Sequence, residues 1–331
     1  MPDPHHPAQK CLGPHEPGAG TLRAVDRLRR ENPVFRRLTL AAFALVTLAS
    51  CAAPATPEAP ASSAQSAAPA AAKTVAQPDF AALEKAFDAR LGVYAIDTGN
   101  GREVAYHADD RFAYASTHKV FNAAAILHRG DDLARTVTIR QSDLVSNSPI
   151  TEKHVGEQMS LQSVLDAALR YSDNTADNLM FREIGGPAGL AAELRRLGDT
   201  VTHVDRIEPA LNETSPGDVR DTTTPRAWAK DLRAVALDSG LPADKQAVLT
   251  KIMRANTTGA HVIRAGVPAD WQVADKTGSA EYATRNDIAV VWPPNRAPIV
   301  LAVLSDRPRK DAKTDDKLIA QAAAAVVKAL Q

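Results

Sequence analysis

Two residues three positions apart could supply a nucleophile and a base. Ser116 and Lys119 lie in the segment Ser-Thr-His-Lys, and residues at this spacing share one face of a helix. The following residues, 120–127, are almost all apolar, which predicts a buried helix. A serine at its start would face the positive end of the helix dipole, and a desolvated lysine could act as a base. Read alone, the pair also fits a helix-capping serine beside a snorkelling lysine.

Two further short motifs follow at domain-scale spacing. Ser-Asp-Asn occupies 172–174, after a helical segment, and Lys-Thr-Gly occupies 276–278 and continues to Ser279. Alone, the first is typical of a polar turn or helix cap, and the second of an edge strand with an exposed lysine. A glycine inside a strand often marks the close approach of another backbone or a ligand.

A non-periodic stretch lies between these motifs. Residues 206–221 contain Pro209, Pro216 and Gly217, which indicates a loop. Glu208 precedes Pro209 there, and by itself it would be a solvated glutamate in a turn.

The elements that must position these residues include strands near both ends of the expected domain. We expect a helix at 80–87, a strand at 91–96 and a turn into a second strand. Near the C-terminus we expect strands at 287–292 and 299–304, joined by a proline-rich turn, and a closing helix at 318–330. Mostly helical sequence lies between. This order predicts one mixed sheet built from both chain ends, with an inserted helical lobe.

Together the four motifs resemble those of class A serine β-lactamases, from near Asp79 to the C-terminus. The resemblance implies an α/β (α+β) fold, with an antiparallel sheet built from both chain ends, flanked by helices. It also implies an inserted all-helical lobe, roughly residues 115–254, and a cleft between lobe and sheet. The expected activity is hydrolysis of the β-lactam ring of penicillins and cephalosporins through a serine acyl-enzyme, conferring antibiotic resistance.

The resemblance assigns catalytic roles to five residues. Ser116 attacks the β-lactam carbonyl, Ser172 delivers a proton to the departing nitrogen, and Glu208 activates the hydrolytic water with Asn212 as its second anchor. Either Lys119 or Glu208, acting through water, takes the proton during acylation.

The remaining positions are implied to bind substrate or to hold the loop. Asn174 would contact the substrate side-chain amide, and Lys276, Thr277 and Arg285 the substrate carboxylate. The backbone N–H groups of Ser116 and Ser279, beside Gly278, would form the oxyanion hole. Asp173 would bond backbone in its turn, and Arg206 and Asp221 would form an ion pair that clamps the Ω-loop.

Three other functions share some of these motifs. A penicillin-binding carboxypeptidase or transpeptidase has Ser-x-x-Lys and Lys-Thr-Gly but should lack the Glu208 and Asn212 pair. A penicillin sensor would be acylated once and stay acylated. An esterase with Ser-x-x-Lys would need neither Lys-Thr-Gly nor the loop.

Composition narrows the choice of partners. The chain carries 39 basic and 39 acidic residues, and this balance argues against nucleic acid as a partner. Its two cysteines, Cys11 and Cys51, precede the expected domain, so that domain should have no disulfide and no thiolate metal site. His118 and His154 lack a third ligand at zinc spacing, and His118 is expected to be a packing position. We expect no cofactor or metal and a monomer.

The N-terminus has the features of an export signal. After an extension at 1–35, residues 36–51 combine paired arginines, a short apolar run and Leu-Ala-Ser-Cys, typical of a signal peptide with a lipobox at Cys51. A plain secretory signal is the alternative, and the paired arginines also suggest a twin-arginine signal. Residues 52–77 predict a flexible Ala/Pro/Ser tether, and 78–331 the folded domain. The expected location is the cell envelope, as a lipoprotein, or otherwise secreted or periplasmic.

Overall fold

The two ends of the folded domain meet in one antiparallel sheet. The computed structural model describes residues 75–331. Every neighbouring pair of strands in this sheet is antiparallel, and the spatial order is β2 (Glu103–Tyr106), β1 (Arg90–Asp97), β9 (Ile299–Asp306), β8 (Thr284–Trp292) and β7 (Gln272–Ala280). Strand β1 pairs with β9 along its whole length, from Arg90 opposite Asp306 to Asp97 opposite Ile299. The first and last strands therefore lie at the centre of the sheet.

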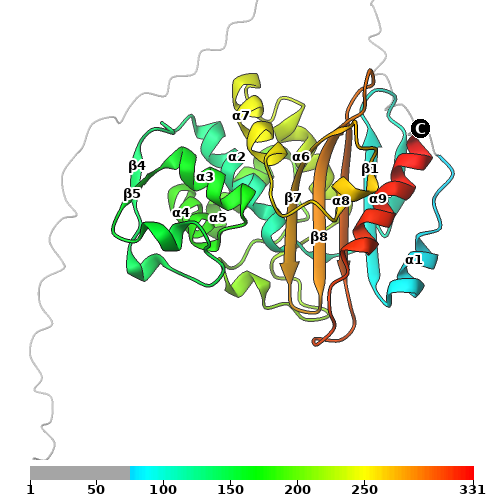
Figure 1. Cartoon of the computed structure of the whole chain (residues 1–331), viewed down its shortest axis with the longest axis horizontal. Coiled ribbons are helices and arrows are strands. Elements are labelled where there is room, and N and C mark those ends of the chain that lie inside the picture. The colour runs from blue at the N-terminus through cyan, green and yellow to red at the C-terminus, as the bar shows by residue number, and fades with distance from the viewer. Residues whose placement is uncertain (1–74) are drawn as a thin grey trace, which may run out of the picture. The chain divides into compact units, whose positions relative to one another are not determined.

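Helices cover both faces of the sheet, which explains why its strands are almost continuously apolar. One face carries α1 (Phe80–Phe87), α8 (Ile263–Gly266) and α9 (Asp316–Leu330), seen together at the right of Figure 1. The alanine-rich α9 buries Leu318, Ile319 and Val326 against strand residues such as Val93 and Val303.

The other face of the sheet packs against α6 (Pro225–Ala236), which in turn packs on α2 (Lys119–Arg129), the helix that follows Ser116. Thr224 caps α6 by accepting a hydrogen bond from the Ala227 amide, and proline follows at its first position, as helix starts favour. The α6 residue Trp228 is fully buried and lies 4.3 Å from the Phe121 ring of α2.

The inserted lobe lies beside the β7 edge of the sheet (Figure 1). Its other helices are α3 (Leu161–Arg170), α4 (Asn174–Ile184), α5 (Pro187–Leu197) and α7 (Ala243–Arg254). Short 3₁₀ turns connect them, namely η1 (Ala115–His118), η2 (Gln141–Asp143), η3 (Thr151–His154) and η4 (Ala210–Asn212). The strands β3 (Phe112–Ala113) and β6 (Thr222–Thr223) pair where the chain enters and leaves the loop region.

The predicted fold class is confirmed, with two local differences. The lobe is not wholly helical, because β4 (Thr136–Thr138) and β5 (Gln158–Ser160) form a two-stranded ribbon inside it. Ser116 lies on the 3₁₀ turn η1 and not in the α-helix that starts at Lys119. The expected extension, signal and Cys51 lie outside the described residues, as does most of the tether. Among residues 75–331, no helix is long and apolar enough to cross a bilayer.

Candidate active site

The turn that carries Ser116 is pressed against the edge strand β7. Ala115, just before the serine, has a left-handed backbone with φ 48°, a conformation that non-glycine residues adopt at a cost. At Gly278 of β7, a Cβ atom would lie 3.0 Å from the Tyr114 carbonyl oxygen and 3.2 Å from the Ala115 Cβ. A glycine at this strand position therefore permits the close approach of η1.

Lys119 is fully buried and faces oxygen atoms from two other segments. Its Nζ donates to the Ser172 carbonyl oxygen at 2.9 Å and to the Asn174 Oδ1 at 2.6 Å. It also lies 3.1 Å from the Glu208 Oε1. The lysine thus joins the serine turn, the Ser-Asp-Asn turn and the loop that bears Glu208.

The Ser-Asp-Asn turn is fixed by its middle residue. The Asp173 carboxylate caps α4 by accepting from the Ala176 amide at 2.8 Å, and it also accepts from the Ile150 and Thr151 amides. Ser172, before it, has φ 58°. This anchoring turns the Ser172 hydroxyl toward Lys119 and Lys276.

Glu208 is buried and contacts Ser116 as well as Lys119. The Ser116 hydroxyl donates to its Oε1 at 3.3 Å, and the Asn212 Nδ2 donates to its Oε2 at 2.5 Å. Asn178 of α4 holds the Glu208 backbone from both sides, at 3.0 Å to the amide and 2.8 Å to the carbonyl. The carboxylate is therefore fixed within reach of the serine hydroxyl.

The loop from 205 to 221 is closed by the predicted ion pair. Arg206 Nε lies 2.5 Å from the Asp221 Oδ2, and Asp221 is fully buried. The other carboxylate oxygen of Asp221 accepts from the Asp205 and Arg206 amides and from the Tyr114 hydroxyl. This pairing ties the base of the loop to the segment that precedes Ser116.

On β7, a second buried lysine meets the Ser172 hydroxyl. The Lys276 Nζ donates to the Ser172 Oγ at 3.0 Å and to the Thr277 carbonyl oxygen at 2.8 Å. Burial, together with the nearby positive charge of Lys119, lowers the pKa of Lys276 to about 7. The next residue, Thr277, shares a hydrogen bond of 2.6 Å with the Thr258 hydroxyl.

Arg285 reaches the same edge from β8, but it has its own acidic partner. Its guanidinium binds the Asp316 carboxylate of α9 in a bidentate manner, at 2.6 and 3.1 Å. The remaining Nη1 donates to the Ser279 hydroxyl at 3.2 Å.

These groups line a cleft of about 570 Å³ between β7 and the lobe. Its walls include Ser116, Asn147, Ser172, Asn174, Asn212, Thr277, Gly278, Ser279 and Arg285. A larger hollow of about 1090 Å³ lies between α1 and the tip of the loop, and none of the predicted site residues lines it. The smaller cleft is therefore the candidate active site, because most of the predicted site residues line it.

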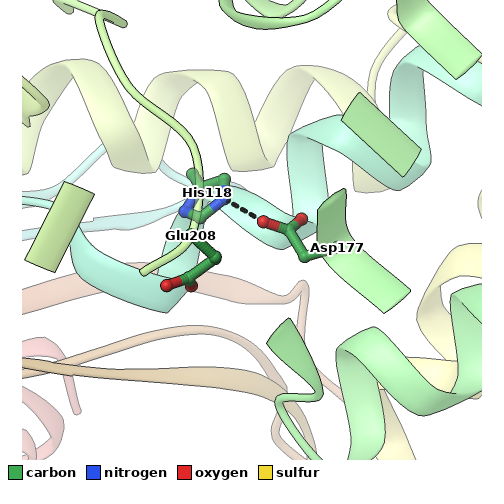
Figure 2. Close-up of side chains that lie close together, drawn as sticks. All are labelled: His118, Asp177 and Glu208. Carbon is green, nitrogen blue, oxygen red and sulfur yellow. Dashed lines mark hydrogen bonds and ion pairs between the residues drawn. The ribbon is translucent and has the colours of Figure 1, made fainter. Parts of the chain in front are cut away.

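A polar pair lies behind the serine turn. His118 and Asp177 are both fully buried, and the His118 Nε2 lies 2.7 Å from the Asp177 Oδ2. His118 therefore has polar partners, and packing alone does not describe it. Figure 2 shows that the Glu208 carboxylate points away from this pair. Candidate ligand atoms of the three residues lie within 4.8 Å of one another, but they engage in hydrogen bonds and in the contact with Lys119.

Sequence reasoning missed Asn178, Thr258 and Asp177. Asn178 lies four residues after Asn174 and so on the same face of α4, which is the one signal that could have identified it. Thr258 and Asp177 lie outside every motif, and their partners are distant in sequence.

The comparisons with known proteins agree with this geometry. Residues 76–330 match the family model described as the beta-lactamase enzyme family. A beta-lactamase from Bacillus licheniformis is 51% identical over 298 residues, which cover 89% of this chain and 97% of the relative. A beta-lactamase from Amycolatopsis lactamdurans is 54% identical over 256 residues, covering 77% and 85%.

Solved structures give the same result. The crystal structure of a class A beta-lactamase from Clostridium kluyveri superposes with a TM-score of 0.74 at 48% identity, covering 76% of this chain and 97% of that one. A halotolerant bacterial beta-lactamase superposes equally well at 49% identity.

Proposed function

The chain belongs to the class A β-lactamase family and hydrolyses the β-lactam ring, and on this basis we propose that Ser116 and Glu208 perform the two halves of the reaction. The observation that carries the proposal is the position of the buried Glu208 carboxylate, which meets the Ser116 hydroxyl on one oxygen and Asn212 on the other. One carboxylate can thus serve both the nucleophile and a water held by Asn212.

In acylation, the Ser116 oxygen attacks the lactam carbonyl carbon and the carbon–nitrogen bond breaks. Either Lys119 or Glu208, acting through a water, accepts the serine proton, and because the two groups lie 3.1 Å apart, Lys119 can take it up where Glu208 is replaced. The Ser172 hydroxyl gives a proton to the departing nitrogen, and the proton taken from Ser116 is passed to Ser172 through Lys119, which leaves Glu208 ionised for the second half of the reaction. The Ser116 and Ser279 amides stabilise the carbonyl oxygen.

In deacylation, water attacks the ester carbon and releases the Ser116 oxygen. Asn212 orients that water, and Glu208 removes a proton from it and returns this proton to the Ser116 oxygen. A penicillin-binding enzyme would have no carboxylate at this place, so its acyl-enzyme would persist.

Substrate is held by its two polar ends. Lys276 and Thr277 bind the carboxylate, and Arg285 supports this subsite while paired with Asp316. Asn174 binds the side-chain amide of penicillins and cephalosporins.

Replacing the carboxylate tests these roles. In Glu208→Ala, benzylpenicillin should still acylate Ser116, but the adduct should accumulate, and turnover should fall by about a thousandfold or more. Intact mass after mixing and product per enzyme molecule are the two measurements. The matched control is Glu213→Ala, an exposed glutamate of the same loop, which should turn over like the parent. Rapid turnover by Glu208→Ala would sink the assignment.

We further propose that the enzyme is exported and held at the cell envelope as a monomer, through lipidation of Cys51. The paired arginines, apolar run and Leu-Ala-Ser-Cys at 36–51 support this. Recovery of the enzyme in the membrane fraction is the measurement that tests it.

A further inference from the structure

Both ring nitrogens of the buried His118 face oxygen acceptors. Nδ1 lies 2.7 Å from the Ala115 carbonyl oxygen, and Nε2 lies 2.7 Å from the Asp177 Oδ2 (Figure 2). A carbonyl oxygen can only accept, so Nδ1 must carry a proton. An ionised carboxylate can also only accept, and the Asn122 amide already donates to its other oxygen at 2.9 Å.

A neutral imidazole has a single N–H, so it cannot donate to both neighbours. Both hydrogen-bond distances are explained when Nδ1 and Nε2 of His118 each carry a proton and the Asp177 carboxylate is ionised. Burial by itself lowers the pKa of His118, but the Asp177 carboxylate outweighs it and raises that pKa above its ordinary value. Burial likewise raises the pKa of Asp177, but His118 reverses this and lowers it.

The His118–Asp177 pair joins η1 and α4, and the separation of these two elements determines the geometry of the site. His118 and Ala115 belong to η1, where the left-handed Ala115 fixes the direction of Ser116. Asp177 belongs to α4, which also carries Asn174, bound to Lys119, and Asn178, bound to the Glu208 backbone. The contact between His118 and Asp177 therefore fixes the position of Ser116 relative to Lys119 and Glu208.

We propose that His118 and Asp177 form a buried ion pair that positions the Ser116 turn for acylation. The inference rests on the proposed function, because it acts through Ser116. His118 and Asp177 are positioning residues, since neither lines the cleft. The other charged groups near His118 are Glu208 from the loop and Lys119, the first residue of α2, and the rings of Tyr114 and Phe181 pack on it.

The test measures acylation alone, in the Glu208→Ala background, by following benzylpenicillin adduct formation with rapid mixing and mass spectrometry. His118→Phe keeps a flat ring beside Phe181 but removes both donors. It should slow adduct formation by about tenfold to a hundredfold, because small displacements of a nucleophile cost this much. The matched control is His128→Phe at the far end of α2, where His128 pairs with Glu193 at 3.1 Å. It should acylate at the parent rate.

His118→Phe leaves the Asp177 carboxylate buried without its partner, which can prevent folding. The double variant His118→Phe/Asp177→Leu replaces both members by apolar groups and removes that penalty. It should fold, as judged by circular dichroism, and acylate as slowly as His118→Phe. Parent-like acylation by the folded double variant overturns the positioning role.

A protonation readout separates an ion pair from a structural contact. With ¹⁵N-labelled histidine, both ring nitrogens of His118 should carry protons at neutral pH, and the signal is identified by its loss in His118→Phe. A neutral ring in the parent overturns the ion pair. In Asp177→Asn the His118 signal should titrate near its ordinary pKa of about 6.5 or below. Its acylation rate should fall over the same range, because the ring then loses one donor, whereas purely structural damage would lower the rate equally at every pH.

The two hypotheses fail in different ways. If Glu208→Ala accumulates no adduct, the proposed roles of Ser116 and Glu208 are wrong. If it accumulates adduct at a rate that His118→Phe and the double variant leave unchanged, only the positioning role is wrong.

Discussion

Two lysines from distant elements converge on one hydroxyl in this site. Lys119 of α2 and Lys276 of β7 both reach Ser172, with Nζ–Oγ distances of 3.5 and 3.0 Å. Like charges at this spacing disfavour one another, particularly where both are buried. Burial and the nearby charge of Lys119 lower the pKa of Lys276. Lys276 is the residue that the proposed mechanism assigns to the substrate carboxylate.

This arrangement predicts a pH-dependent KM. As pH rises through about 7, the depressed pKa means that Lys276 loses its charge, so attraction for the substrate carboxylate weakens. KM for benzylpenicillin should rise by about tenfold to a hundredfold on the alkaline side, the worth of a charge-assisted hydrogen bond. In Lys276→Arg the guanidinium stays charged, and the rise should disappear. Steady-state kinetics across neutral pH decide this, and a flat KM in the parent would contradict it.

At this scale the motifs located residues that the structure brings together, and missed the residues that support them. Ser116, Lys119 and Glu208 stand in recognisable short patterns. Asn178 and Asp177 do not, because a hydrogen-bond partner on another element is set by tertiary packing and leaves no local pattern. The sequence predicts a packing position at His118 for the same reason, since its acceptor Asp177 lies on a different element.

Among the elements, the Ω-loop depends on one carboxylate at its base. Asp221 accepts four hydrogen bonds, two from backbone amides of the loop, one from Arg206 Nε and one from the Tyr114 hydroxyl. Because the same loop presents Glu208, its anchoring and the second half of the reaction should be linked.

Asp221→Ala should therefore both destabilise the protein and slow deacylation. It leaves the mostly buried Arg206 guanidinium without its carboxylate, and the Tyr114 hydroxyl and two loop amides without their acceptor, at a cost of about 3 kcal/mol, measurable by urea unfolding. Acyl-enzyme should persist after mixing with benzylpenicillin, because Glu208 is no longer held in place. Asp218→Ala is the control on the same loop, since Asp218 pairs with the exposed Arg220 and should change little. Normal turnover by a loosened Asp221→Ala loop would separate anchoring from catalysis.

Elements with a strong period were predicted closely, and short ones were not. The helix at 80–87 and the strands on either side of the C-terminal turn match α1, β8 and β9 to within a few residues. The β4 and β5 ribbon has three residues in each strand, too few to show a period. The 3₁₀ turn at Ser116 is continuous in sequence with α2, and the close approach at Gly278 that accompanies it is a tertiary contact.

For the whole molecule, the decisive feature is that both ends of the domain share the sheet. The side chains of Arg90 in β1 and Asp306 in β9 form an ion pair of 2.5 Å, and α9 supplies Asp316 to the substrate edge. The described residues contact the domain from their first member onward, because Val75 packs on the core and the Gln77 side chain accepts from the Ala105 amide. The described residues 75–331 therefore form one folded unit that contains every residue given a role in the site, and we propose that the N-terminal segment serves export.

This division predicts separate effects on location and on activity. The full chain, produced in a bacterial host, should be recovered in the membrane fraction, since a lipidated cysteine followed by a tether holds a domain at a surface. Cys51→Ala should release it into the soluble fraction, as should expression of residues 75–331 behind a plain secretory signal. Both should keep the kcat and KM of the parent, because every residue given a role in the site lies within 75–331. If Cys51→Ala remains in the membrane fraction, anchoring does not use this cysteine. If residues 75–331 fold but lose activity, the N-terminal segment contributes to the site.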